Sequence, residues 1–270
     1  MQIAVIIPAA GSSRRYIEAS GAEGIGRQKI DEDLGGRPVL QRTVELFTKH
    51  PDVSLIIVAG PADPDAFRTF KERHADKLGL LGVKLCQGGK DHRYQTVANA
   101  LALVPDTCTH VAVHDAARPC ASEELIERVF NAARDGQKAA VPGVDVPDTL
   151  KRVSEKEVAA SKADPLAAIL GDSAAAKPVG RLVDQTVDRT RLVAVQTPQV
   201  FERELLKKAY AQKDLASTDD AQLVERLGQP VLVVPGDPAN IKITRPRDLV
   251  LARVILGVRP PAQRETHMRF

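Results

Sequence analysis

The chain has 270 residues, with 38 lysines and arginines against 35 aspartates and glutamates and a formal net charge of +3. This balance does not fit a protein that binds nucleic acid by neutralising many phosphates, and the 3% aromatic content without tryptophan disfavours stacking of single-stranded bases. No stretch approaches the roughly 20 apolar residues of a membrane span. Cys86, Cys108 and Cys120 show no C-x-x-C spacing, so we expect free thiols in a cytoplasmic protein that binds neither nucleic acid nor membranes.

Short apolar runs rich in valine and isoleucine recur along the chain and predict buried strands. Segments with helical periodicity lie between them. This alternation is typical of a mostly parallel sheet covered on both faces, so we expect an α/β fold, a Rossmann-like three-layer sandwich. The apolar runs are 3–7, 53–59, 83–85, 110–114, 139–144, 192–195 and 231–234, and the helical segments are 39–50, 93–103, 122–133, 202–212, 218–227 and 246–256.

One region, 147–188, breaks the alternation because it is polar, rich in alanine and charged, with neither a clear strand nor a long amphipathic helix. It is too long for an ordinary connection between elements. We therefore expect a single domain, 1–258, from which this region protrudes as an arm. A short C-terminal tail, 259–270, follows the domain.

The first apolar run leads into a loop, IPAAGSSRRYIEASGAEGIGRQK, that ends at Lys29. It lacks the G-x-G-x-x-G fingerprint of a dinucleotide site and the G-x-x-x-x-G-K-[ST] of a P-loop. Small residues after a strand let the backbone approach a ligand, and Arg14, Arg15 and Lys29 could neutralise a phosphate chain. Taken alone, the loop is equally compatible with a flexible basic surface segment.

Further charged residues follow other predicted strands. The run 110–114 leads into DAARP, where Asp115 and Arg118 could hold a hydroxyl group or a Mg²⁺ ion, although such a pair is more often a structural ion pair. Arg189 and Lys242 add two cations near later strands. Because ligands bind at the carboxyl ends of parallel strands, we expect the loops after residues 7, 85, 114 and 144 to share one edge. Cations gathered there would require an anionic ligand.

With these residues assembled, the chain resembles the 2-C-methyl-D-erythritol 4-phosphate cytidylyltransferase family. The resemblance implies transfer of the cytidylyl group of CTP to the polyol phosphate, with Mg²⁺ as the cofactor and CTP as co-substrate. It also implies a homodimer in which the protruding arm is the dimerisation arm. The motifs that carry it run in family order and read PAAGSSRR, LGGRPVL after Lys29, GG…R..TV, VHDAARP, DTLKR, TVDR, QTPQVF, STDDAQLVE and NIKITRPRDL.

The same resemblance assigns roles to individual residues. Catalytic roles, in charge stabilisation and in positioning the sugar phosphate, fall on Arg15, Lys29, Arg189 and Lys242. The CTP site falls on Ala9, Ala10, Gly11, Gly89, Arg93 and Thr96. The polyol site falls on Asp115, Arg118, Thr149 and Thr197, with Asp115 also assigned to the metal.

The sequence departs from the family pattern at four places. The loop between Arg15 and Lys29 is longer, KIDED replaces a KQ followed by apolar residues, one extra residue precedes Arg93, and an insertion occupies 153–185. Two alternatives stay open: a cytidylyltransferase for another polyol phosphate such as ribitol 5-phosphate, and a nucleotide-binding homologue without catalysis.

Overall fold

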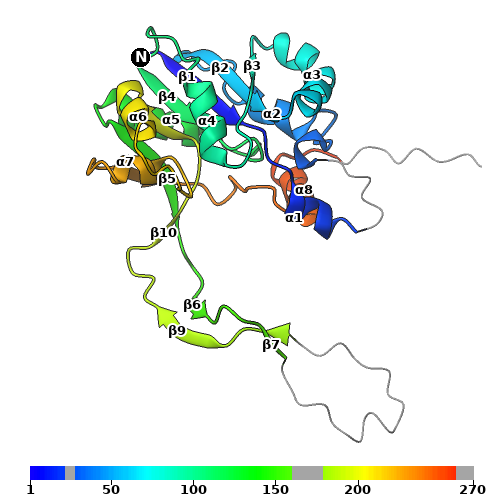
Figure 1. Ribbon diagram of the computed structural model, residues 1–270, viewed down its shortest axis with the longest axis vertical. Coiled ribbons are helices and arrows are strands. Elements are labelled where there is room, and N and C mark those ends of the chain that lie inside the picture. The colour runs from blue at the N-terminus through cyan, green and yellow to red at the C-terminus, as the bar shows by residue number, and fades with distance from the viewer. Residues whose placement is uncertain (22–27, 160–178, 260–270) are drawn as a thin grey trace, which may run out of the picture. The chain divides into compact units, whose positions relative to one another are not determined.

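A computed structural model describes residues 1–21, 28–159 and 179–259 (Figure 1). The chain divides into two compact units, Met1–Val144 together with Val195–Phe270, and Asp145–Ala194. The second unit is slightly longer than the arm expected from the sequence. Residues 22–27 of the lengthened first loop, 160–178 of the arm insertion and 260–270 of the tail lie outside the described residues.

The main sheet has the strand order β10-β5-β11-β4-β1-β2-β3, and β12 also pairs with β5. Strand β1 runs parallel to both of its neighbours, and the pairs β2–β3 and β12–β5 are also parallel. Strand β11 runs antiparallel to β4 and β5. The predicted α/β class with a mostly parallel sheet is confirmed. The strands are β1 (Ile3–Pro8), β2 (Val53–Gly60), β3 (Lys84–Gln87), β4 (His110–Val113), β5 (Ala139–Asp145), β10 (Val193–Val195), β11 (Gln199–Glu202) and β12 (Leu232–Pro235).

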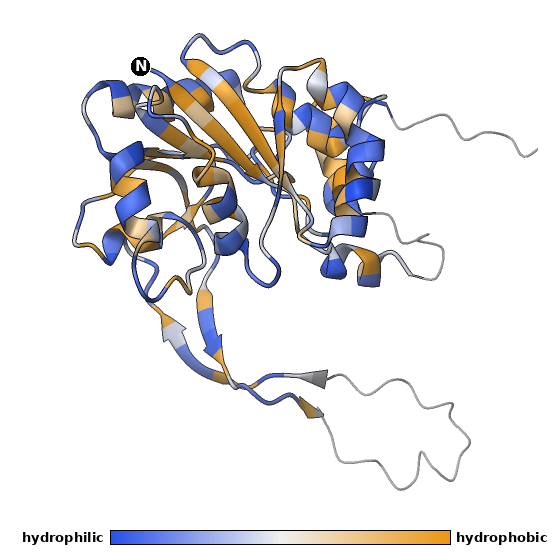
Figure 2. Cartoon of the chain, turned by 45° about the horizontal axis from the view of Figure 1, so that its top comes forward, coloured by the Kyte–Doolittle hydropathy of each residue, from blue (hydrophilic) through white to orange (hydrophobic). Residues whose placement is uncertain are grey.

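Helices cover both faces of this sheet, which makes the three layers (Figure 2). In β1, Ile3, Val5 and Ile7 join the core under one set of helices, while Ala4 and Ile6 join the core on the opposite face. Successive side chains of a strand point to opposite faces, so a strand covered on both sides reads as a continuous apolar run. The first set is α2 (Val39–Glu45), α3 (Pro64–Gly79) and α5 (Glu123–Arg134), and the second is α4 (Arg93–Leu101), α6 (Arg203–Tyr210) and α7 (Ala221–Glu225).

A third apolar cluster joins the two ends of the described chain. Tyr16 of α1 (Arg14–Ala19) packs with Leu249 of α8 (Pro246–Ile255), and Ile243 and Ala117 belong to the same cluster. The labels α1 and α8 lie side by side in Figure 1. This packing brings the loop after β1, the loop after β4 and the segment before α8 together at one edge of the sheet.

Helices α1 and α3 were not predicted from the sequence, and α2 is shorter than expected. Helix α3 was not singled out, because Phe70, His74 and Leu78 are its only buried residues among 16; Asp63 caps its start by accepting from the Ala66 N–H. Helix α2 ends at Glu45 rather than near residue 50. The Thr48 hydroxyl donates to the Glu45 carbonyl there, and the chain tightens into turns before Pro51.

The second unit contains two short antiparallel ladders, β6 (Leu150–Val153) with β9 (Val183–Val187), and β7 (Val158–Ala159) with β8 (Val179–Gly180). The expectation that this region lacks strands was therefore wrong for these residues. Most side chains of β9 are exposed, so it has no buried face and none of the apolar alternation that would reveal a strand.

Candidate active site

A cavity of about 500 Å³ lies at the carboxyl ends of the parallel strands. The segments after β1, β3 and β4 all contribute to its wall, as the sequence rule for open α/β sheets predicts. Lys29 and Lys242 reach it from two other segments. The lining is strongly cationic, with Arg14, Lys29, Lys90, Arg93 and Lys242 against only Asp91 and Asp115.

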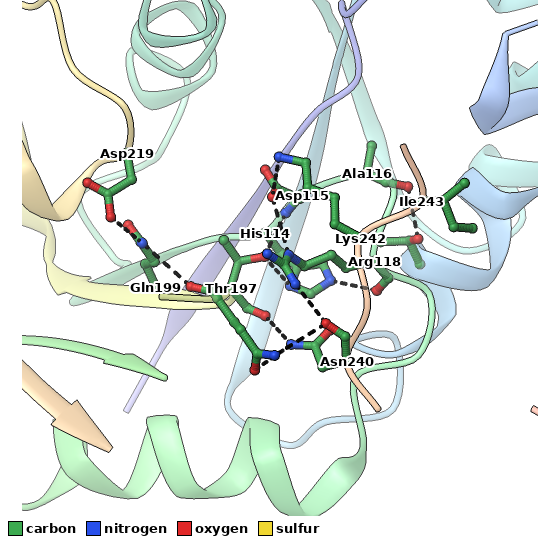
Figure 3. A network of polar contacts seen from close by, with 12 residues as sticks. His114, Asp115, Ala116, Arg118, Thr197, Gln199, Asp219, Asn240, Lys242 and Ile243 are labelled. Carbon is green, nitrogen blue, oxygen red and sulfur yellow. Dashed lines mark hydrogen bonds and ion pairs between the residues drawn. The ribbon is translucent and has the colours of Figure 1, made fainter. Parts of the chain in front are cut away.

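Asp115 is the acidic centre of this site (Figure 3). Its Oδ2 lies 2.8 Å from the Lys242 ammonium and 3.4 Å from Arg118 Nε, and its Oδ1 lies 3.6 Å from Arg93 Nε. Burial alone would raise the pKa of the Asp115 carboxyl, but Lys242 and Arg93, with Arg118, hold that pKa well below its usual range. Asp115 is therefore a permanent anion among three cations.

The main chain of Asp115 is held by a buried relay that starts at His114. Thr197 Oγ1 accepts from the Asp115 N–H at 3.0 Å and lies 3.2 Å from His114 Nδ1, while His114 Nε2 lies 3.0 Å from the Arg118 carbonyl. Burial lowers the pKa of His114 to about 4, so the ring is neutral and has one donor and one acceptor. The arrangement needs Nε2–H to donate to the carbonyl and Nδ1 to accept from the Thr197 hydroxyl.

Asn240 and Gln196 connect this relay to the segment that carries Lys242. Asn240 donates from Nδ2 to the Thr197 carbonyl at 2.9 Å, and its own carbonyl accepts from Arg118 Nη1 at 2.7 Å. Gln196 Nε2 donates to the Asp237 carbonyl. The sequence motifs contained Asn240 and Gln196, but nothing in their spacing marked them as partners of each other.

Lys29 approaches the site from η1 (Lys29–Asp31), a single 3-10 turn. Its ammonium donates to the Ile243 carbonyl at 2.9 Å, next to Lys242. Burial and the charge of Lys242 lower the pKa of Lys29 to about 8, with a smaller contribution from Arg15 and an opposing one from Asp115. Two lysines from distant parts of the chain thus serve the same small volume.

The side of the cavity assigned to CTP is built from small residues. A Cβ at Gly89 would lie 2.1 Å from Gln95 Cβ, so only glycine fits there. The Gly89 N–H donates to Thr96 Oγ1 at 3.0 Å, which fixes the loop on α4. Ala9, Ala10 and Gly11 line the same cavity. Close approach of backbone groups to a flat base needs such a surface.

The Gln95 side chain holds the turn that starts α4. Gln95 Oε1 accepts from both the Asp91 and the His92 N–H, at 2.9 and 3.2 Å. The His92 ring stacks on Tyr94 with 5.0 Å between ring centroids, and His92 lines the cavity.

Arg93 links the site to a second buried carboxylate that sequence reasoning missed. Its Nη1 lies 2.8 Å from Asp220 Oδ2, and the Tyr210 hydroxyl donates to Asp220 Oδ1. Burial opposes the charge on Arg93, but Asp220 and then Asp115 raise its pKa above the usual range. The STDDAQLVE motif contained Asp220 without indicating its partner.

The three remaining predicted site residues are Arg15 of the first unit and two residues of the second unit. Arg15 is exposed on α1 and does not line the cavity, whereas its neighbour Arg14 does. Arg189 and Thr149 belong to the second unit, where the Arg189 guanidinium donates to the carbonyls of Val146 and Pro147 and Thr149 is exposed. The roles assigned to these three residues stay predictions.

The donor set fits Mg²⁺ in one limited way. Mg²⁺ is commonly held by one or two carboxylates together with substrate phosphates. Asp115 is the carboxylate available between the two lysines, and no group of three or more histidine, cysteine or acidic residues that could hold a metal exists among the described residues. A Mg²⁺ ion held by Asp115 and a triphosphate is chemically consistent with this arrangement.

A mostly parallel α/β sheet with a cationic cavity at its carboxyl edge, small residues on one side and a single buried acid at the centre, defines an enzyme of the nucleotidyltransferase class. The IspD family model, described as 2-C-methyl-D-erythritol 4-phosphate cytidylyltransferase, matches residues 3–168 and 161–258. The chain belongs to this family.

Individual relatives agree with this membership. The chain is 41% identical over 261 residues to the 2-C-methyl-D-erythritol 4-phosphate cytidylyltransferase of Frankia casuarinae, covering 97% of this chain and 84% of the relative. A bifunctional IspD/IspF enzyme of Solidesulfovibrio magneticus is 36% identical, with 92% of this chain matching 56% of that protein. The crystal structure of the Thermus thermophilus cytidylyltransferase superposes with a TM-score of 0.66 at 32% identity, covering 96% of this chain and all of that one. None of the described helices has the length and apolar character needed to cross a membrane.

Proposed function

We propose that the protein joins CTP and 2-C-methyl-D-erythritol 4-phosphate to give 4-diphosphocytidyl-2-C-methyl-D-erythritol and pyrophosphate, in non-mevalonate isoprenoid biosynthesis. Family membership supports this proposal, and the observation that carries it is the cationic cavity around Lys29, Lys242 and Asp115. Five cations that line one cavity against two carboxylates suit a ligand as anionic as a nucleoside triphosphate.

The reaction forms one phosphorus–oxygen bond and breaks another. A phosphate oxygen of the polyol phosphate attacks the α-phosphorus of CTP, and the bond to the oxygen that bridges the α- and β-phosphates breaks, so that pyrophosphate leaves with the electron pair. The attacking phosphate is already ionised, so no side chain need remove a proton. Catalysis then depends on position and on neutralisation of charge.

The lysines supply that neutralisation in the proposed mechanism. The Lys242 ammonium pairs with Asp115 and the Lys29 ammonium lies against the Ile243 carbonyl next to it, in a partly buried volume where charges interact more strongly than in water. Arg15 adds charge near Lys29 and Arg189 positions the sugar phosphate. Thr197 and Arg118 hold the polyol together with Asp115, and Thr149 completes this set. A bound Mg²⁺, held by Asp115, supplies further neutralisation of the triphosphate.

The quaternary assignment belongs to the same proposal. The protein acts as a homodimer through the arm, 147–188, so that Arg189 and Thr149 serve the partner's site. The arm's exposed apolar side chains Leu182 and Val183 support an interface there. A cytoplasmic location is supported by the free state of Cys86, Cys108 and Cys120.

The test is a pyrophosphate-release assay with CTP, Mg²⁺ and either 2-C-methyl-D-erythritol 4-phosphate or ribitol 5-phosphate. We expect turnover with the first substrate. Turnover with ribitol 5-phosphate alone would replace the substrate assignment. Binding of CTP without turnover of either polyol phosphate would indicate a nucleotide-binding homologue.

Arg189→Ala should lower kcat by orders of magnitude with folding intact, and normal turnover of this variant would remove the role assigned to Arg189.

A further inference from the structure

A buried acidic residue lies two positions after Lys29 and binds two side chains of α3. Asp31 Oδ1 lies 2.7 Å from His74 Nε2, and Asp31 Oδ2 lies 2.7 Å from Arg73 Nη1. His74 is 3% exposed, and only 14% of the Asp31 side chain is accessible. This clamp, formed by Asp31, His74 and Arg73, stands where the sequence departs from its family by reading KIDED.

The clamp acts on a short turn. The turn η1 has three residues, and the Asp31 N–H donates to the Gln28 carbonyl at 2.9 Å. The Lys29 N–H reaches Ser13 Oγ only at 3.4 Å. Ile30 is buried in the core under α2 and α3, but an apolar contact does not fix direction as a pair of hydrogen bonds does. The direction of the Lys29 side chain therefore depends on Asp31.

The other half of the clamp is on a firmly held helix. Helix α3 runs for 16 residues from its Asp63 cap, and Phe70 and Leu78 are buried in the core. The His74 ring packs on Phe70 with 4.8 Å between centroids. Helix α3 packs closely against the sheet at β2, because a Cβ at Gly60 would lie 2.9 Å from the Phe70 ring. The clamp thus attaches the turn that carries Lys29 to a helix that is packed firmly against the sheet.

We propose that Asp31, His74 and Arg73 are positioning residues for the nucleotidyl transfer: they orient the η1 turn so that the Lys29 ammonium is held beside Ile243 and Lys242, where the transferring phosphate binds. This inference rests on the proposed function for the identity of the ligand. A shift of about 1 Å in such a group can cost about 100-fold in rate, so a clamp outside the cavity can control turnover.

Electrostatics support an ionic clamp. Burial would raise the pKa of Asp31, but the hydrogen bond from His74 and the charges of His74 and Arg73 lower it below its usual value. The carboxylate is therefore ionised at neutral pH. The Lys29 ammonium faces a different set of charges: Lys242 and Arg15 lower its pKa, and Asp115 and Asp248 raise it. A turn released from the clamp would expose Lys29 to water and bring its pKa closer to 10.5.

The test compares the wild-type enzyme with Asp31→Ala and with His74→Gln, which replaces the ring by a shorter amide. The matched control is Asp65→Asn, which breaks an exposed ion pair with Arg68 on the same helix. The measurements are kcat, KM for CTP, the pH profile of kcat/KM, thermal unfolding, and calorimetric binding of CTP with Mg²⁺. If Asp31→Ala does not fold, His74→Gln and Arg73→Ala carry the test.

For Asp31→Ala we expect kcat to fall by ~10- to 100-fold, CTP binding to weaken by ~10-fold, and the alkaline limb of the pH profile to move upward from about 8. The control should match the wild type, and Arg73→Lys should retain most activity. A lower melting temperature with unchanged kcat and an unchanged alkaline limb would assign the clamp a structural role only. If the wild type turned over no polyol phosphate, the proposed function would fail, and CTP binding equal to wild type in Asp31→Ala would separately overturn this inference.

Discussion

The neutral state of His114 predicts a specific sensitivity to acid. The ring is fully buried. Protonation would turn Nδ1 from an acceptor into a donor, so the hydrogen bond that the Thr197 hydroxyl donates to it would be lost. The pKa falls from 6.5 to about 4 on folding, so the unfolded chain binds more protons between these values. The stability contributed by His114 is therefore present above about pH 6.5 and is lost as the pH falls towards 4.

The magnitude follows from the two pKa values. Lowering the pH from about 7.5 to about 5 should cost about 2 kcal/mol of unfolding free energy through His114 alone. Urea unfolding of the wild type and of His114→Gln at both pH values isolates this amount, because every other titrating group is common to both proteins. Parallel losses of stability in the two proteins would refute the reasoning. If the variant does not fold, an NMR titration that places the wild-type ring near its ordinary pKa would do the same.

Three further predictions concern the cavity. The kcat/KM for CTP should fall as the pH rises through about 8, because Lys29 loses its charge there, and a flat profile up to about pH 9.5 would contradict its role. Asp220→Asn should lower the free energy of unfolding by about 2 kcal/mol, measured in urea, because the partly buried Arg93 guanidinium loses its nearest charged partner. Gly89→Ala should raise KM for CTP by ~10-fold or more, while Gly79→Ala, where a Cβ meets nothing within 4 Å, should leave it unchanged.

Among the strands that sequence patterns predicted, β1 and most of β2 are buried, whereas β3, β10 and β12 are largely exposed. Ile3–Pro8 and Val53–Gly60 read as continuous apolar runs because helices cover them on each side. Gln199–Glu202 was not predicted, because it is four residues long and follows Pro198 directly. The ladder of β6 with β9 escaped detection for the opposite reason, since exposed side chains leave no periodic signal.

The site was predictable only in part, for a related reason. Polar residues at strand ends stand out against apolar runs, and this marked Asp115, Lys29 and Lys242 before the motif resemblance assigned their roles. Their supporting partners do not stand out. Asp220 touches Arg93 across 127 positions, and His74 touches Asp31 across 43. Such pairs are chosen by the tertiary fold, and a single sequence contains no sign of which polar residues will meet.

The long-range contacts of Asp115 also determine when the site can form during synthesis of the chain. Asp115 depends on Thr197 for its main-chain bond and on Lys242 for its nearest cation, 82 and 127 positions further along. A nascent chain can form β1, β2 and β4 well before those residues leave the ribosome. Contacts this distant form late and slowly in folding. The catalytic edge is therefore completed only after residue 242 has been synthesised, so a chain that stops short of this residue would have a sheet without a working site.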